Sequence, residues 1–252
     1  MPVYRDLEGA LRCISALVDA GSARPRGVPD LLEPAPPVEA AGYWRARGLL
    51  EAAGVEFAEA RRVKHDQEAL AAADELGYPV VLKALGHVHK SDAGGVAVGL
   101  ADAGALERKL SKMTTAETSE YSVERMAPVE EGIELIVGSR RDPRFGPVTL
   151  VGMGGLYTEV LGDVAVALAP IGEAEAERLI GSLRGAPLLL GARGRPALDV
   201  PAAARATAAL SRTAAEHPEI DELEINPLLV LPEGALALDA RIVLGGGDRD
   251  AA

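Results

Sequence analysis

Short β-strand patterns dominate the second half of the chain, and most follow one another at the spacing of hairpins. Two alanine- and leucine-rich helical patterns, at about 173–184 and 200–216, interrupt the series. Helices mixed with hairpin-spaced strands, without strict βαβ alternation, predict an α+β fold and not a doubly wound sheet. The expected strands are Tyr121–Met126, Ile133–Gly138, Pro147–Gly152, Val164–Leu168, Glu222–Leu231 and Ala235–Leu244.

A proline-rich stretch between Pro25 and Pro37 separates the start of the chain from the rest. Proline has no amide donor and a fixed φ, so this stretch is predicted to be a linker. We therefore expect an N-terminal segment and linker over 1–37, a first α+β subdomain over 38–125, and a second over 126–252.

Four elements are expected in the first subdomain before the strand Tyr121–Met126. A leading helix should cover 38–54, and a second helix should run from a cap at Asp66 to Gly77. A strand over 78–85 and a helix after Asp102 should follow.

Composition narrows the class of protein. The chain has 252 residues with 26 Lys and Arg against 38 Asp and Glu, a net charge of −12, and 3% aromatic residues. An acidic chain with few aromatic rings is a poor nucleic-acid binder, because it lacks both phosphate neutralisation and stacking surfaces. The single cysteine, Cys13, excludes a disulfide framework. The sequence contains no run of about 20 apolar residues, the length needed to cross a membrane. The N-terminus also lacks the pattern of a secretory signal, so we expect a cytoplasmic protein.

A glycine- and histidine-rich segment, GHVHKSDAGGV over 86–96, follows the strand that ends near Lys83. Free backbone amides, Lys83 and Lys90 would favour a phosphoryl group there. A neutral imidazole is a competent phosphoryl acceptor, so His87 or His89 is a candidate nucleophile. A surface loop with incidental histidines, or a metal pair made by the two histidines, remains open on spacing alone.

The closing hairpin carries a polar row. Glu222, Glu224 and Asn226 alternate with apolar residues, so their side chains share one face of a strand. The turn Pro-Glu-Gly over 232–234 would bring Asp239 opposite Asn226. Carboxylate and amide oxygens on adjacent strands suit Mg²⁺, although an ordinary solvated acidic face has the same pattern.

A third candidate is the run of glycines between Gly152 and Gly155, which follows an apolar strand. Such glycines allow the backbone to approach a ligand, but they also occur in plain tight turns. Three acids, Glu124, Glu131 and Glu134, flank an expected strand and its turn. Taken singly, each is interpreted as a solvated charge in preference to a ligand.

Taken together, three segments resemble the ATP-grasp subunit or domain of NDP-forming acyl-CoA synthetases, relatives of the succinyl-CoA synthetase β subunit. They occur in the order found in that family and span about 38–244. The combination of HKSDxGGV with ExNP is its specific part. The start of the chain resembles the tail of a CoA-ligase domain, as in fused members. The three segments are GYPVVLKALGHVHKSDAGGVAVGL, GIELIVGSRRDPRFGPVTLVGMGGLYTEVL and DELEINPLLVLPEGALALDARI.

The resemblance implies an ATP-grasp fold in which two α+β subdomains enclose a nucleotide. Lys83 matches the lysine that contacts the phosphates, and Glu124 with the backbone of Met126 matches the hinge that reads adenine. His89 matches the histidine that relays phosphate.

It also implies ligands for Mg²⁺ and further nucleotide contacts. Asn226 and Asp239 match the metal ligands, and Glu224 matches the acid beside the site of phosphoryl transfer, where it is expected to orient His89. Further nucleotide contacts are expected from Glu134 (ribose), Glu159 (glycine-rich loop), Lys90, Gly94 and Gly95.

The expected function is nucleotide binding and phosphoryl transfer in an acid–CoA ligase, with ATP or ADP as substrate and a partner chain or domain that binds CoA. Two other hypotheses remain at this stage. One is a carboxylate–amine ligase that proceeds through an acyl phosphate. The other is a module that senses nucleotide without turnover.

Overall fold

The structure is a computed structural model that describes residues 32–85, 95–113, 120–155, 162–194 and 196–245. The chain separates into two compact units, Met1–Leu32 and Glu33–Ala252. All elements discussed below belong to the second unit. None of the helices in the described part of the chain is long and apolar enough to span a membrane.

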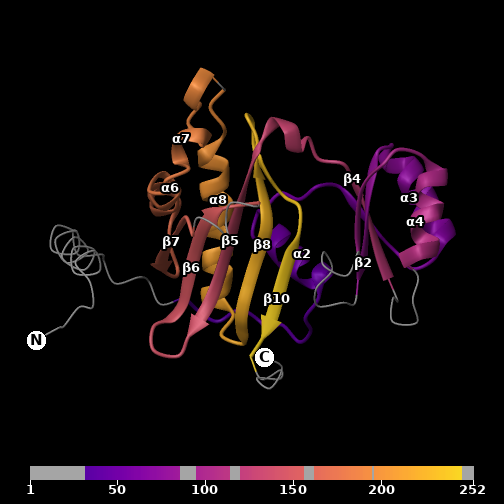
Figure 1. Cartoon of the computed structure of the whole chain (residues 1–252). Helices are drawn as coiled ribbons and strands as arrows, with labels where there is room; N and C mark the ends of the chain where they lie inside the picture. Colours follow the sequence, from indigo (N-terminus) through magenta and orange to yellow (C-terminus); the bar gives the residue numbers. More distant parts are fainter. Residues whose placement is uncertain (1–31, 86–94, 114–119, 156–161, 195, 246–252) are drawn as a thin grey trace, which may run out of the picture. The chain divides into compact units, whose positions relative to one another are not determined.

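The smaller of two antiparallel sheets has four strands in the order β1-β4-β2-β3. Two helices, α3 (Asp66–Leu76) and α4 (Ala103–Met113), lie against one of its faces (Figure 1). Alanines and leucines such as Ala69, Leu76 and Leu106 fill the space between helices and sheet. The strands are β1 (Ala60–Val63), β2 (Val80–Leu85), β3 (Val96–Leu100) and β4 (Glu120–Arg125).

The larger sheet is built in the order β10-β8-β5-β6-β7, with the short strand β9 also paired to β8. The pairings between these strands are antiparallel, both where a hairpin joins the two strands, as for β5 and β6, and where helices intervene in the chain, as for β5 and β8. Its strands are β5 (Ile133–Asp142), β6 (Gly146–Met153), β7 (Val164–Leu168), β8 (Ile220–Val230), β9 (Ala235–Ala237) and β10 (Ala240–Leu244).

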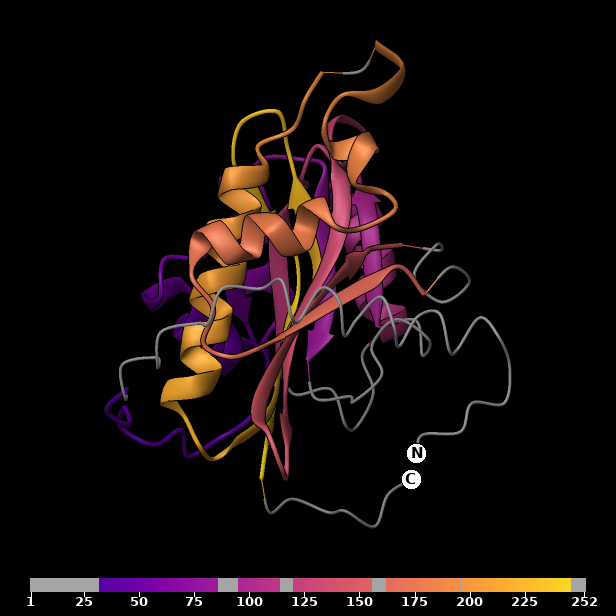
Figure 2. The same cartoon turned by 90° about the vertical axis from the view of Figure 1, so that its left-hand side faces the viewer.

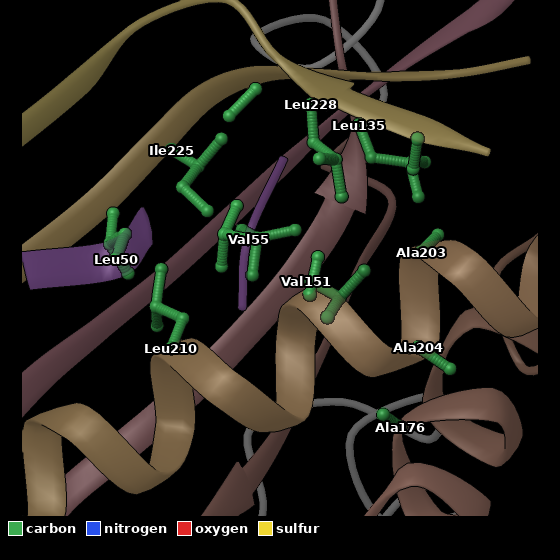
Figure 3. Packing of buried hydrophobic residues seen from close by; sticks show 14 of the residues in the cluster. Leu50, Val55, Leu135, Val151, Ala176, Ala203, Ala204, Leu210, Ile225 and Leu228 are labelled. Carbon is green, nitrogen blue, oxygen red and sulfur yellow. The ribbon is translucent and has the colours of Figure 1, made fainter. Parts of the chain in front are cut away.

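Two helices, α2 (Tyr43–Ala52) and the longer α8 (Val200–Glu216), pack on the larger sheet, and α6 (Glu173–Gly181) packs on α8 (Figure 2). Figure 3 shows apolar side chains of the strands, among them Leu135 and Ile225, lying between the sheet and α8. The alanine-rich face of α8 lets the helix approach the strands closely. Asp199 caps α8, because its carboxylate accepts the amide of Ala202 at 2.9 Å. Shorter helical segments are α7 (Ala186–Leu189), η1 (Val129–Glu131) and η2 (Ala192–Gly194).

The predicted α+β class is confirmed, and most expected elements are present. The helix predicted over 66–77 is α3, although its N-cap is His65 and not Asp66. The leading helix is shorter than predicted, because Gly42 with φ +113° precedes its first turn. Strands β1 and β3 were not predicted. The closing hairpin forms as expected, divided into β9 and β10.

The leading helix packs with the larger sheet. Ala46 and Leu50 of α2 are fully buried in the larger core, alongside Leu210 and Ile225. The division at residue 125 stays a prediction. The helix nevertheless carries polar side chains that reach the smaller sheet, and these help to form the candidate site.

Candidate functional site

A cavity of about 1,630 Å³ is lined by both sheets and by α2. The smaller sheet presents to it the face that α3 and α4 leave uncovered, and the larger sheet presents part of β8 and residues 238–244 of its closing hairpin. The cavity is large enough for a ligand of nucleotide size, since small-molecule sites in proteins span roughly 300–1,000 Å³. Its polar lining includes Lys83, Glu124, Glu134, Glu224, Asn226 and Asp239.

Lys83 lies at the centre of this lining. It is only 5% exposed, and its Nζ lies 3.0 Å from Oε2 of Glu124 on the neighbouring strand. The ammonium also donates to the carbonyl of Leu238 and lies 4.0 Å from Oδ1 of Asp239, both on the larger sheet's hairpin. A buried ammonium needs such partners, because desolvation of an unpaired charge is costly. Lys83 therefore links the two sheets at the cavity wall.

Glu124 is more deeply buried than the lysine, at 2% exposure. In the β2–β4 register Lys83 stands opposite Ser122, so Glu124 is its diagonal neighbour on the same face. The Oε1 atom of Glu124 accepts hydroxyl hydrogen bonds from Ser122 and Tyr43, each at 2.8 Å. Both carboxylate oxygens thus have donors, which compensates for the burial of the charge.

Tyr43 reaches this pair from the first turn of α2. Its hydroxyl accepts a hydrogen bond from Arg47 at 3.2 Å, and its ring lies 5.0 Å from Nζ of Lys83. Burial and then the neighbouring Glu124 carboxylate raise the pKa of Tyr43 far above its usual range. The phenol therefore stays protonated and serves as a donor to Glu124.

Arg47 anchors Tyr43 to its surroundings. The guanidinium donates to Glu51 and to the carbonyl of Ala58, each at 2.8 Å. It also lies over the rings of Trp44, at 5.3 Å, and Phe57, at 4.9 Å. The indole of Trp44 packs edge-on against the ring of Tyr43. Five side chains of α2 and its neighbours are thereby fixed beside the cavity.

The closing hairpin brings together the three residues predicted to act there. The backbone amide of Asn226 donates to the carbonyl of Asp239 at 3.1 Å, so the two residues are opposite each other as expected. The side-chain amide nitrogen of Asn226 donates to Oε1 of Glu224 at 2.9 Å. Asn226 is exposed and Glu224 half-buried, so both can meet a ligand in the cavity.

Glu134 lies at the start of β5 and lines the cavity with Met126. Its carbonyl accepts the amide of Gly154 at 2.7 Å. A Cβ atom at position 154 would lie 2.8 Å from the backbone of Glu134, so this close approach requires glycine. The glycine run after β6 therefore has a packing role next to Glu134.

Several predicted residues lie outside the described part of the chain: His87, His89, Lys90, Gly94 and Glu159. Gly95 is described, and its carbonyl accepts the amide of Ala84 at 2.8 Å. The expected contact between Glu224 and His89 is therefore untested. Among the described residues no group of three His, Cys, Asp or Glu side chains is placed to hold a metal ion. A cation here would need ligand oxygens in addition to two protein groups.

Sequence reasoning missed Tyr43, Arg47, Ser122 and the carbonyl of Leu238. Tyr43 and Glu124 are 81 residues apart and Lys83 and Leu238 are 155 apart, so no local pattern could have indicated these contacts. Ser122 could have been found, because it shares a strand face with Glu124.

The arrangement has distinct chemistry on its two sides. A buried ammonium, Lys83, lies where it can meet an anionic group, and oxygen-bearing side chains on the hairpin lie where they can bind a hard cation. Anionic phosphate with a divalent cation is the ligand that matches both sides.

Comparisons with known proteins identify the family of this chain. The model of the ATP-grasp domain family matches residues 39–244. Subunit β of the ADP-forming acetate–CoA ligase I of Pyrococcus furiosus is 36% identical, over 79% of this chain and 89% of its own length. The ADP-forming acetate–CoA ligase I of Archaeoglobus fulgidus is 39% identical over 79% of this chain. The chain spans only 30% of that longer relative.

A solved structure is similar as well. It is the dinucleotide-forming acetyl-coenzyme A synthetase 1 of Ca. Korarchaeum cryptofilum with coenzyme A and Mg-AMPPCP, its phosphohistidine segment pointing towards the nucleotide-binding site. The TM-score is 0.70 at 35% identity, with 80% of this chain and 91% of that chain covered. Since the family model covers residues 39–244, and with them both sheets and the helices packed on them, the chain belongs to the ATP-grasp domain family.

Proposed function

We propose that this chain is the nucleotide-binding and phosphoryl-transferring component of an ADP-forming acid–CoA ligase. The net reaction is acyl-CoA + ADP + Pi ⇌ acid + CoA + ATP. The observation that carries the proposal is the cavity wall itself, where Lys83 faces the oxygen-bearing hairpin of Glu224, Asn226 and Asp239. Relatives of the same family, named as ADP-forming acetate–CoA ligases, support it.

A CoA-binding partner completes the reaction. The relative of Archaeoglobus fulgidus is more than three times as long as the matched part of this chain, whereas the Pyrococcus furiosus relative is a separate β subunit. The acid and CoA sites are expected on the partner chain or domain, which delivers its phosphoryl group to this cavity. Acyl specificity then belongs to the partner.

Lys83 is proposed to contact the nucleotide phosphates. Its ammonium is already oriented by Glu124 and by the Leu238 carbonyl, so little reorganisation is required when an anion arrives. Met126 and Glu124 are proposed to border the adenine, and Glu134 the ribose. Contacts from the glycine-rich segments, through Lys90, Gly94, Gly95 and Glu159, remain sequence-based predictions.

Asn226 and Asp239 are proposed as the protein ligands of Mg²⁺. The residues fit, because Asn226 directs its amide nitrogen to Glu224, which leaves its oxygen for a cation, and Asp239 lies opposite, between β9 and β10. Mg²⁺ is commonly held by one or two protein groups together with substrate phosphates. When bound, the ion neutralises charge on the phosphate oxygens during transfer.

His89 is proposed as the phosphoryl carrier. In the direction of enzyme phosphorylation, an imidazole nitrogen of His89 attacks the γ-phosphorus of ATP, the bond to the β-phosphate oxygen breaks, and ADP leaves. Glu224 is proposed to accept a hydrogen bond from the other ring nitrogen and so to set the tautomer. The phosphohistidine segment in the Ca. Korarchaeum cryptofilum structure supports this role by likeness.

The experiment that tests the function is incubation with Mg²⁺ and [γ-³²P]ATP, followed by mass spectrometry of the intact chain. The wild-type chain should gain one phosphoryl group that is labile to acid. His89→Ala should lose the label while nucleotide binding is retained, and His87→Ala serves as the matched control that keeps it.

Undiminished labelling of His89→Ala would contradict the relay. Release of ADP that depends on an acid and an amine, without a phosphoenzyme, would indicate a carboxylate–amine ligase instead. Nucleotide binding without labelling or ligase activity, with or without an added CoA-binding subunit, would indicate a sensor.

A further inference from the structure

Tyr43 occupies a position in the site that the proposed reaction does not yet use. Its hydroxyl donates to Oε1 of Glu124 at 2.8 Å, and the phenol ring lies 5.0 Å from Nζ of Lys83. Tyr43 is 5% exposed, so these contacts are shielded from bulk water. A hydrogen bond to a charged group in such surroundings is stronger than one in water.

The direction of the hydrogen bonds is fixed by Arg47. A guanidinium carries donors only, so the contact of 3.2 Å between Arg47 and the Tyr43 oxygen must use an Arg47 N–H. The Tyr43 hydroxyl is therefore the donor in its hydrogen bond with Glu124. Arg47 is itself held by Glu51 and by the Ala58 carbonyl, so the tyrosine is oriented from behind.

The two carboxylate oxygens of Glu124 have different partners. Tyr43 and Ser122 both donate to Oε1, while Lys83 lies 3.0 Å from Oε2. With Oε1 occupied by two hydroxyls, the carboxylate plane is fixed and Oε2 is directed at the ammonium. Loss of the Tyr43 hydroxyl removes one of these two donors to Oε1 and leaves the Ser122 hydroxyl.

The helix α2, which supplies Tyr43, connects the Lys83–Glu124 pair to the larger sheet. The buried face of α2 belongs to the core of the larger sheet, through Ala46 and Leu50. Glu124 and Lys83 belong to the smaller sheet. Tyr43 thus extends from an element packed on one sheet to a charged pair on the other, and Lys83 extends back to the Leu238 carbonyl.

We propose that Tyr43 is a positioning residue that, through Glu124, holds the Lys83 ammonium in place for the nucleotide phosphates. The inference rests on the proposed function, because it assumes that the cavity binds a nucleotide. It predicts that loss of the hydroxyl weakens recognition of phosphate and leaves recognition of the nucleoside unchanged.

The test compares ADP with adenosine on Tyr43→Phe. Affinity for Mg·ADP is measured by calorimetry, and affinity for adenosine by competition with a fluorescent ADP analogue. Tyr43→Phe should weaken ADP binding about tenfold, the effect of one hydrogen bond to a charged group, and change adenosine binding less than about twofold. Tyr78→Phe is the matched control, since Tyr78 precedes β2 but does not line the cavity.

A double-mutant cycle separates positioning from a general structural effect. In a Lys83→Met background, Tyr43→Phe should change ADP affinity less than about twofold, because the group that it positions is gone. Equal loss of ADP and adenosine affinity, or an undiminished tenfold effect in the Lys83→Met background, would overturn the proposal. So would unchanged ADP affinity in Tyr43→Phe. A wild-type chain that binds neither ligand would instead contradict the proposed function.

Discussion

The two sheets bring their charges to the cavity in opposite ways. On the smaller sheet, Lys83 and Glu124 are 5% and 2% exposed; they pair with each other, and each also has a hydrogen-bond partner outside the pair. On the larger sheet, Asn226 is exposed and the side chain of Asp239 is 32% exposed. The Lys83–Glu124 side of the cavity is buried and preorganised, whereas the hairpin side is accessible to solvent.

The difference matches the two kinds of ligand that phosphoryl transfer requires. An ammonium that meets phosphate gains from a low-dielectric, fixed environment, because the interaction is weak in water. A Mg²⁺ ion loses its water reluctantly and keeps several water ligands, so its protein ligands need solvent around them. The contrast predicts that substitutions of Lys83 or Glu124 reduce both stability and binding, whereas those of exposed hairpin residues such as Asn226 reduce binding alone.

Lys83→Met is the strongest test of the buried Lys83–Glu124 pair. It leaves the Glu124 carboxylate buried without its cation, and the free energy of unfolding should fall by about 3–5 kcal/mol. Denaturant unfolding measures this change. The double variant with Glu124→Gln should recover about half of the loss, since the unpaired charge is removed.

The control for Lys83→Met is Arg61→Met on the same sheet. Arg61 pairs with Glu59 and Glu75 at the surface, and its side chain is 42% exposed. Exposed pairs contribute about 0–1 kcal/mol, so this variant should remain close to the wild type. A similar loss in both variants would mean that burial does not distinguish the two pairs.

Gly154→Ala tests how tightly the larger sheet holds Glu134. The added Cβ would meet the backbone of Glu134 at 2.8 Å, and backbone cannot move aside cheaply. The loss of stability should be about 1–3 kcal/mol, measured by thermal unfolding. Gly181→Ala at the end of α6, where nothing lies within 4 Å of a Cβ, should be neutral or slightly stabilising.

Asn226→Ala should have the smallest effect on stability, within about 0.5 kcal/mol, because the side chain is exposed. The substitution should instead weaken Mg²⁺ binding. The Mg²⁺ concentration needed for half-maximal phosphoenzyme formation should rise about tenfold or more. A large loss of stability, or an unchanged Mg²⁺ requirement, would contradict the view of the hairpin as an open metal-binding wall.

Most of the fold could be predicted because its elements carry local signals. The strand β7 was predicted with its observed ends, and α3 with its C-terminal glycine. Strand β1 was missed because its sequence, Ala-Arg-Arg-Val, has one buried residue and no alternation. Its pairing with β4 supplies what the sequence lacks.

The contacts of the site likewise fall into two groups: those that a local sequence pattern predicts and those between segments far apart in the sequence. The opposition of Asn226 and Asp239 followed from the length of one hairpin turn, and the structure confirms it. The contacts of Lys83 and Glu124 with Leu238 and Tyr43 join segments far apart in the chain. Such contacts depend on how two sheets and a helix pack, which the periodicity of a single segment does not encode.

The indole of Trp44 gives the cavity an optical property of its own. It is the sole tryptophan of the chain, it lines the cavity, and it contacts both the ring of Tyr43 and the guanidinium of Arg47. Its emission therefore comes from a single place, beside the buried charges. Fluorescence titration can follow events in the cavity in real time, without a dye and without an engineered label.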